Sequence, residues 1–80
     1  MTKLEEKLIQ LGYECKGGTN PNGIIYRKKI TEWLFIDILT DVKREKIVYH
    51  KTIQCVIHPI DHTPAFNQLQ KDLEELKQCK

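Results

Sequence analysis

The segment from Trp33 to Leu39 constrains the fold most, because it is apolar on both sides of an extended chain. Successive side chains of a strand point to opposite faces of the sheet. Two apolar triplets alternate along this segment, one on each face: Leu34, Ile36 and Ile38, and Trp33, Phe35 and Leu39. Only Asp37 interrupts the second face. We therefore expect the middle strand of a sheet here. If the helices cover the Leu34 face, then Trp33, Phe35 and Leu39 point away from them.

Further strands are predicted on either side of this segment. Residues 24–29 and 46–53 are rich in β-branched and aromatic residues, and the polar turn 41–45 separates the middle strand from the later one. Together they form a β-meander that extends in phase to Ile57, before Pro59 removes a backbone donor. A short first strand is predicted at 13–15, followed by a loop over 16–23 that is dense in turn-forming residues.

Helices are predicted at both ends of the chain. Thr2 and Glu5 have the spacing of a capping box, and Gly12 stands where a helix commonly ends. In the last helix we expect Thr63 as the cap and Pro64 at the first helical position. The apolar positions of the two helices are Leu4, Leu8 and Leu11 in the first, and Phe66, Leu69, Leu73 and Leu76 in the second. The second stripe is too short for a coiled coil and fits a helix laid on a sheet.

The fold class that follows is α+β, as a single domain over residues 1–80. We expect an N-terminal helix, an antiparallel β-meander of three to four strands and a C-terminal helix, with both helices on one face of the sheet. No apolar run approaches the ~18 residues of a membrane span, and no export signal is visible. Three cysteines are an odd number for a secreted disulfide framework, so a cytoplasmic location is expected.

Catalytic and metal chemistry find little support in the residues. The chain has no serine, and none of its cysteines stands in a context that lowers a thiol pKa. Cys55, His58 and His62 supply ligand types that zinc uses, but the spacing is not paired and Pro59 breaks any helix that would align the histidines. We therefore expect that the chain is not an enzyme and binds no cofactor, metal or small-molecule substrate. The cysteines are expected in the core and the histidines in loops.

The second apolar face of the middle strand is the feature that calls for a partner. The simplest register pairs Lys29 with Glu32 and Leu39 with Lys46, and it would align Tyr26, Phe35 and His50 in one row. Lys28, Trp33 and Thr52 would form the next row. A slip of one residue in the first hairpin would turn Tyr26 to the other face. The partner-binding candidates are Trp33, Phe35, Tyr26 and His50, unless Trp33 and Phe35 belong to the core.

Two kinds of partner remain open for that face. The first is a protein, which includes a second copy of this chain. The second is a weakly bound single-stranded nucleic acid, because aromatic rings edged by cations stack bases. The candidates for nucleic-acid contact are Arg27, Lys28, Lys29, Lys43, Arg44 and Lys46. The net charge of +2 is too small to imply nucleic acid by itself.

The order of motifs along the chain resembles small uncharacterised proteins of phages and prophages from low-GC Gram-positive bacteria. The likeness rests on the helix ending at residues 11–14, on Ile25–Lys28 before an aromatic-rich strand, on Thr63-Pro64 and on the acidic helix at 72–76. The resemblance implies an accessory protein of the host cytoplasm that binds a host protein and blocks or redirects it. It assigns no functional residue.

Overall fold

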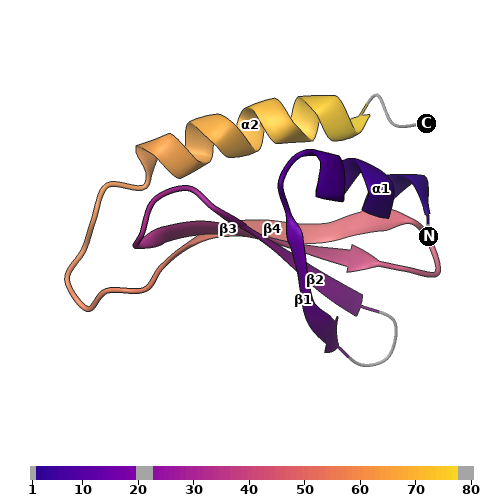
Figure 1. The fold of residues 1–80 in the computed structure, drawn as a ribbon, viewed down its shortest axis with the longest axis horizontal. Helices are drawn as coiled ribbons and strands as arrows, with labels where there is room; N and C mark the ends of the chain where they lie inside the picture. The colour runs from indigo at the N-terminus through magenta and orange to yellow at the C-terminus, as the bar shows by residue number, and fades with distance from the viewer. Residues whose placement is uncertain (1, 20–22, 78–80) are drawn as a thin grey trace.

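The computed structural model describes residues 2–19 and 23–77 and has the predicted α+β architecture. Two helices lie above a four-stranded sheet, and the two ends of the described chain lie near the same end of the molecule (Figure 1). The elements in chain order are α1 (Lys3–Gln10), β1 (Glu14–Thr19), β2 (Gly23–Lys29), β3 (Leu34–Asp41), β4 (Lys46–Gln54) and α2 (Thr63–Lys77).

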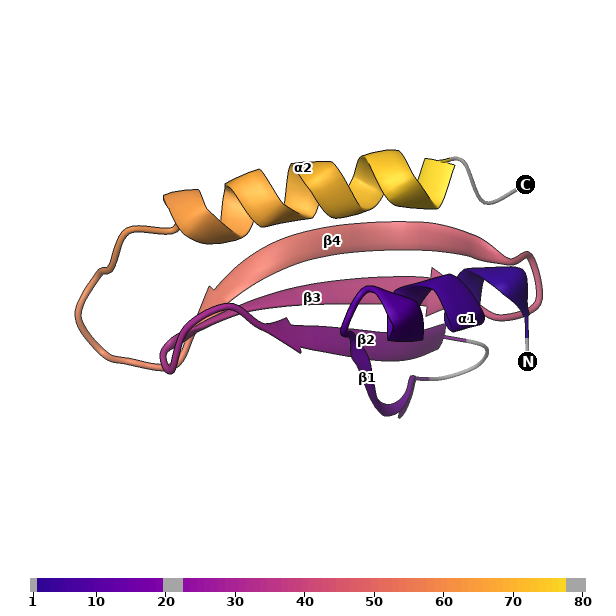
Figure 2. The same ribbon diagram turned by 45° about the horizontal axis from the view of Figure 1, so that its top comes forward.

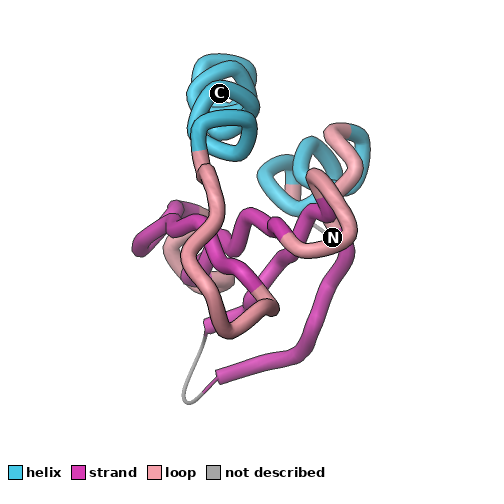
Figure 3. The backbone as a smooth tube through the Cα atoms, turned by 90° about the vertical axis from the view of Figure 1, so that its left-hand side faces the viewer, coloured by secondary structure: helices cyan, strands magenta, loops and turns pink. Residues whose placement is uncertain are grey.

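The sheet is antiparallel throughout, in the order β1-β2-β3-β4, so each strand pairs with its neighbour in sequence. Both helices lie on one face of it, as predicted, and the end-on view shows them side by side above the strands (Figure 3). Leu34, Ile36 and Ile38 face these helices and are at most 1% exposed. The aliphatic triplet of β3 therefore forms the core, and the alternative that Trp33 and Phe35 form it is wrong.

Helix α1 begins and ends as its sequence predicts. The Thr2 hydroxyl accepts a hydrogen bond from the Glu5 backbone N–H, and the Glu5 carboxylate accepts one from the Thr2 N–H. Gly12 follows the helix with φ of 99°, a conformation that glycine adopts without the steric cost of a Cβ. Leu8 is fully buried beneath the helix. This geometry fixes where the chain enters β1.

Helix α2 differs in detail from the prediction. Thr63 is its first residue rather than its cap, and Pro64 is therefore the second. The Asp61 carboxylate accepts hydrogen bonds from the Thr63 N–H and hydroxyl, which lowers the pKa of Asp61. The buried residues are Ala65, Leu69, Asp72 and Leu76. Phe66 is 53% exposed, so the buried face is rotated from the predicted apolar stripe (Figure 2 shows α2 along the sheet).

The strands also differ from the prediction in length and register. β1 extends through the predicted loop to Thr19, and its register with β2 shifts between Cys15 and Gly17. In the first hairpin Lys29 pairs with Phe35 rather than with Glu32. In the second, Leu39 pairs with Tyr49 rather than with Lys46: Lys46 pairs with Asp41, which shifts the register by two residues, and a bulge at Val48 adds one more. Both edge strands of the sheet are therefore bulged.

Candidate functional site: the open face of the sheet

The open face of the sheet is the face away from the helices, and neither α1 nor α2 lies on it (Figure 3). Residues that pair directly across two antiparallel strands point to the same face. On β2, β3 and β4 the open-face positions include Ile25, Arg27, Lys29, Phe35, Asp37, Leu39, Tyr49, Lys51 and Ile53. Strand pairing arranges these nine in three rows across the sheet, and a fourth row of Gly23, Asp41 and Lys46 lies at the end next to the turn between β3 and β4.

The middle row alternates in charge across all four strands. It consists of Glu14, Arg27, Asp37 and Lys51, which are successive pairing partners in β1, β2, β3 and β4. The Arg27 guanidinium donates to both Asp37 oxygens, over 2.7 and 3.0 Å, and this interaction raises the pKa of Arg27. Such two-pronged pairs are geometrically specific. We call Glu14, Arg27, Asp37 and Lys51 the charged row.

Apolar rows lie on either side of the charged row. On one side Phe35 pairs with Ile53, and the Arg27 guanidinium carbon lies 5.5 Å from the centre of the Phe35 ring. On the other side Ile25, Leu39 and Tyr49 follow one another across β2, β3 and β4. These five side chains are partly exposed, and Tyr49 is 42% exposed.

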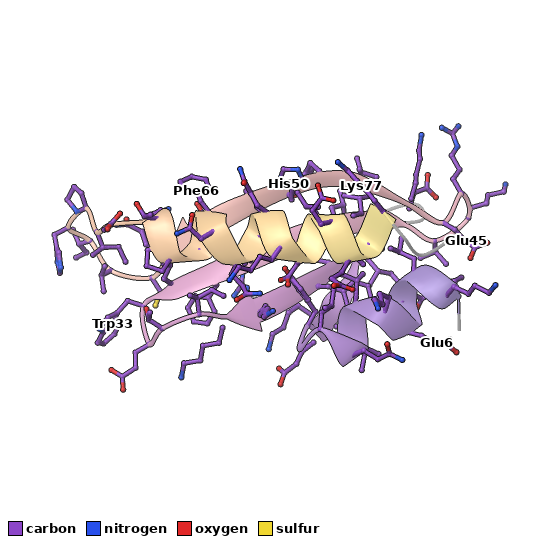
Figure 4. The ribbon with its side chains drawn as sticks, turned by 90° about the horizontal axis from the view of Figure 1, so that it is seen from above. Glu6, Trp33, Glu45, His50, Phe66 and Lys77 are labelled. Carbon is purple, nitrogen blue, oxygen red and sulfur yellow. The ribbon has the colours of Figure 1, made fainter. Side chains whose placement is uncertain are left out.

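The four predicted partner-binding residues do not form one surface. Phe35 lies on the open face, but Trp33 lies in the connection between β2 and β3, where it is 52% exposed. Tyr26 and His50 pair with Ile38 on the helix side of the sheet, so the predicted row of Tyr26, Phe35 and His50 does not form. Figure 4 shows Trp33 at the end of the molecule opposite Glu45, and His50 beside α2.

Tyr26 is 2% exposed because α1 lies over it. Its hydroxyl donates to the Glu5 carboxylate over 3.0 Å, and this hydrogen bond lowers the pKa of Glu5. Burial raises the pKa of Tyr26, and the hydrogen bond to Glu5 adds to the shift. Tyr26 therefore connects α1 to β2 and is not available to a partner.

A polar cluster that the sequence analysis missed attaches α2 to the rest of the fold. Asp72 is 2% exposed and accepts hydrogen bonds from the Tyr13 hydroxyl at 2.8 Å, Lys28 Nζ at 3.0 Å and Gln68 Nε2 at 2.9 Å. Burial raises the pKa of Tyr13 above its usual range, and the hydrogen bond to Asp72 raises it further. The cluster is enclosed by packing and fully hydrogen-bonded, which is typical of a structural role. The sequence does contain a signal for this cluster: Asp72 is spaced three and four residues from Leu69 and Leu76, which places it on the same face of the helix as these apolar residues.

The six predicted nucleic-acid residues fall into separate places. Arg27 is paired with Asp37, and Lys28 is paired with Asp72 on the helix side. Lys29 is the last residue of β2. The remaining three residues lie at the opposite end of the sheet, in and beside the turn between β3 and β4: Lys43, Arg44 and Lys46. Arg44 also lies 3.9 Å from Asp41. No continuous basic strip results from these six residues.

Of the three residues considered and rejected as zinc ligands, His62 makes hydrogen bonds within the fold. His62 Nδ1 lies 2.7 Å from the Thr52 hydroxyl, and His62 Nε2 lies 2.9 Å from Gln54 Oε1. Gln54 also donates to the carbonyls of Val56 and His58, so its amide organises the loop between β4 and α2. Among the residues that the structure describes, no group of three metal-ligating side chains comes together. Cys15 and Cys55 are free and exposed, not core residues, and Cys79 lies outside the described residues.

Hollows on the surface of the described residues include two beside the sheet. A groove of about 590 Å³ lies between α2 and β4, with Ile47, Val48, Leu73 and Leu76 among its lining residues. A smaller hollow of about 320 Å³ lies where β1 meets the open face and is lined by Glu14, Arg27, Lys29 and Phe35, together with Gly12 and Lys16.

No described helix has the length and apolar character needed to cross a bilayer. The chain matches no protein-family model, and no curated protein or solved structure is significantly similar to it.

Proposed function

We propose that this chain is a non-enzymatic protein-binding module whose contact surface is the open face of the sheet. The observation that carries the proposal is the composition of that face. A solvated face of an antiparallel sheet is normally polar. Here the open-face positions of β2, β3 and β4 include Ile25, Phe35, Leu39, Tyr49 and Ile53. Exposed apolar side chains bordered by charged ones in this way mark interaction sites.

The bulged edges of the sheet support the face as the contact surface. An edge strand can pair with another chain through its free backbone groups, and bulges and lysines oppose such pairing. β1 has a bulge at Lys16, and β4 has a bulge at Val48 between Lys46 and Lys51. Both edges are thus poorly suited to accept another strand.

The partner in this proposal is a protein, in keeping with the accessory role that the resemblance to phage proteins implies. Single-stranded nucleic acid is the less well supported alternative. Arg27 and Lys28 are already in ion pairs, and Tyr26 is buried. Phosphate contacts are strongest at low ionic strength, so titration of a single-stranded oligonucleotide at low salt tests this alternative directly.

The proposal is tested by retention of proteins from a bacterial lysate on the immobilised chain. Ile25→Thr and Tyr49→Thr remove apolar surface from the open face while keeping a residue type that favours strands. Val48→Thr is the matched control, because Val48 is 54% exposed and lines the groove beside α2. Emission of Trp33, the only tryptophan, monitors unfolding in each variant.

The expected result is loss of a retained protein, or of self-association, in the two open-face variants and not in Val48→Thr. Equal binding by all variants, when all are folded, would contradict the proposal. Loss only in Val48→Thr would assign binding to the groove instead.

A further inference from the structure

The open face is complementary to itself, and we infer that its partner is a second copy of this chain, packed face to face about a two-fold axis parallel to the strands. The inference rests on the proposed function and names the occupant of the same surface. Two sheets packed in this way lie about 10 Å apart with their strands nearly aligned. The axis places β1 of one copy over β4 of the other, and β2 over β3.

The charged row supplies the first argument. Read from β1 to β4, its signs are negative, positive, negative and positive, in the order Glu14, Arg27, Asp37 and Lys51. The axis reverses this order in the second copy. Each Glu14 then faces a Lys51, so two pairs of opposite charge form across the interface. Each Arg27 faces an Asp37 of the other copy, but Asp37 is 4% exposed and stays paired with Arg27 of its own copy. A two-fold axis perpendicular to the strands would instead set each charge against its own copy, which is repulsive.

The apolar rows supply the second argument, because large side chains meet empty positions. Tyr49 of one copy lies opposite Gly17 of β1, where the absence of a side chain leaves room for a ring. A Cβ added at Gly17 would meet nothing within 4 Å, so this position is open. Leu39 lies opposite Ile25.

The remaining row follows the same pattern. Phe35 of one copy lies opposite Lys29 of the other, an arrangement in which a cation can approach an aromatic ring. Ile53 is directed to the hollow of about 320 Å³ at the start of β1. The three rows thus favour the same axis.

The expected dimer is weak. Four strands about 4.8 Å apart and about six residues at 3.3 Å each give a face of roughly 19 by 20 Å. This area is about 400 Å² per copy, or about 800 Å² in total, which is below the roughly 1,600 Å² of a standard interface. We expect a dissociation constant on the order of 100 μM, which weakens as salt rises because the charged row contributes to it.

The test is sedimentation velocity over about 10 μM to 1 mM with charge reversals at the two ends of the row. Glu14→Lys or Lys51→Glu alone places like charges together at both ends of the dimer, and each should weaken association about tenfold. The double variant restores both pairs, and an equimolar mixture of the two single variants forms a heterodimer with both pairs restored. Dimerisation should return to the wild-type level in these two samples.

Matched controls carry the same charge changes off the open face. Glu32→Lys and Lys43→Glu are in exposed connections and should leave association unchanged. Both Glu14 and Lys51 are exposed, so their variants should fold, which circular dichroism verifies. Lys16, which lies 3.3 Å from Glu14, is the same in every sample.

Three outcomes would overturn the inference: a wild-type chain that is monomeric at about 1 mM, a dimer that the single reversals do not weaken, or a mixture that does not recover. None of these decides the proposed function, because the lysate experiment compares open-face variants for binding to a different protein. Loss of lysate binding in Tyr49→Thr, together with a monomeric wild type, would retain the proposed function and reject self-association.

Discussion

Lys28 and Asp72 form an ion pair of 3.0 Å that joins β2 to α2 across the core. The side chain of Lys28 is 18% exposed and that of Asp72 is 2% exposed, so neither charge is well solvated. An ion pair in this position stabilises less than its Coulomb energy suggests, but loss of one partner is costly because the other charge stays buried.

Asp72→Asn should therefore lower the free energy of unfolding by about 3 kcal/mol. The asparagine can still accept from the Tyr13 hydroxyl, so the main loss is the negative charge opposite Lys28. Adding Lys28→Met to this variant should recover about 1 kcal/mol or more, because the unpaired charge is removed. Urea unfolding of the four proteins of this double-mutant cycle measures the coupling. Additive effects of the two changes would contradict it.

The hydrogen bond from Tyr26 to Glu5 predicts acid sensitivity. Because the folded pKa of Glu5 is lower than its ordinary value of 4.5, its contribution to stability is fully present above about pH 4.5. This contribution is lost as the pH falls through the lower folded value. Tyr26→Phe should remove part of this pH dependence, and Glu5→Gln should remove it. Thermal unfolding between about pH 6 and pH 3 measures it.

Glu6→Gln is the matched control for this prediction, since Glu6 lies one residue from Glu5 on the exposed side of α1 (Figure 4). It should keep the pH dependence of the wild type. A wild-type stability that falls no more steeply with acid than that of Glu5→Gln would refute the role of this carboxylate.

The positive φ of Gly12 predicts a backbone cost on substitution. Gly12→Ala should destabilise the fold by about 1–2 kcal/mol, because an L residue is strained at φ of 99°. The added Cβ would meet Lys28 Cε at 3.7 Å, an ordinary contact, so crowding adds little. Gly18→Ala is the comparison, with its nearest contact at 3.5 Å and no positive φ. A larger loss at Gly18 than at Gly12 would show that conformation is not the cause.

The amide of Gln54 predicts a local effect in the loop between β4 and α2 together with a loss of global stability. It makes four hydrogen bonds, with Val56, His58, Ile60 and His62, and all of these residues lie in the loop between β4 and α2. Gln54→Ala should speed hydrogen exchange at the Ile60 amide and cost about 1–2 kcal/mol of global stability. The Thr52→Val variant, which removes only the hydroxyl near His62, should change exchange less. Unchanged exchange at Ile60 would contradict this role of Gln54.

The fold was predictable because its signals are local. The capping box at Thr2 and Glu5, the left-handed Gly12 and the alternation along β3 each depend on a few neighbouring residues. Which face the helices cover did not follow from the sequence, because both faces of β3 carry an apolar triplet, and the structure shows that the aliphatic one is buried. β1 was underestimated, because Gly17 and Gly18 have low strand propensity and are placed by pairing with β2.

The strand register was not predictable from the sequence. Most residues of the candidate site were therefore not predictable either, because the register decides which side chains share a face. Both hairpins depend on turns without a glycine or asparagine to fix them, and the Val48 bulge has no sequence signature. At Leu39 the observed partner, Tyr49, is three residues from the predicted Lys46. An odd shift moves side chains to the other face, which is why Tyr26 and His50 were misplaced. The charged row depends on the same register.

The bulges at Lys16 and Val48 also limit how large any assembly of this chain can grow. A sheet with a free edge can add strands without end, whereas a single face is used up by one partner. With both edges closed to further strands and one face open, association through that face stops at a pair. Raising the concentration should therefore increase the number of pairs, not their length.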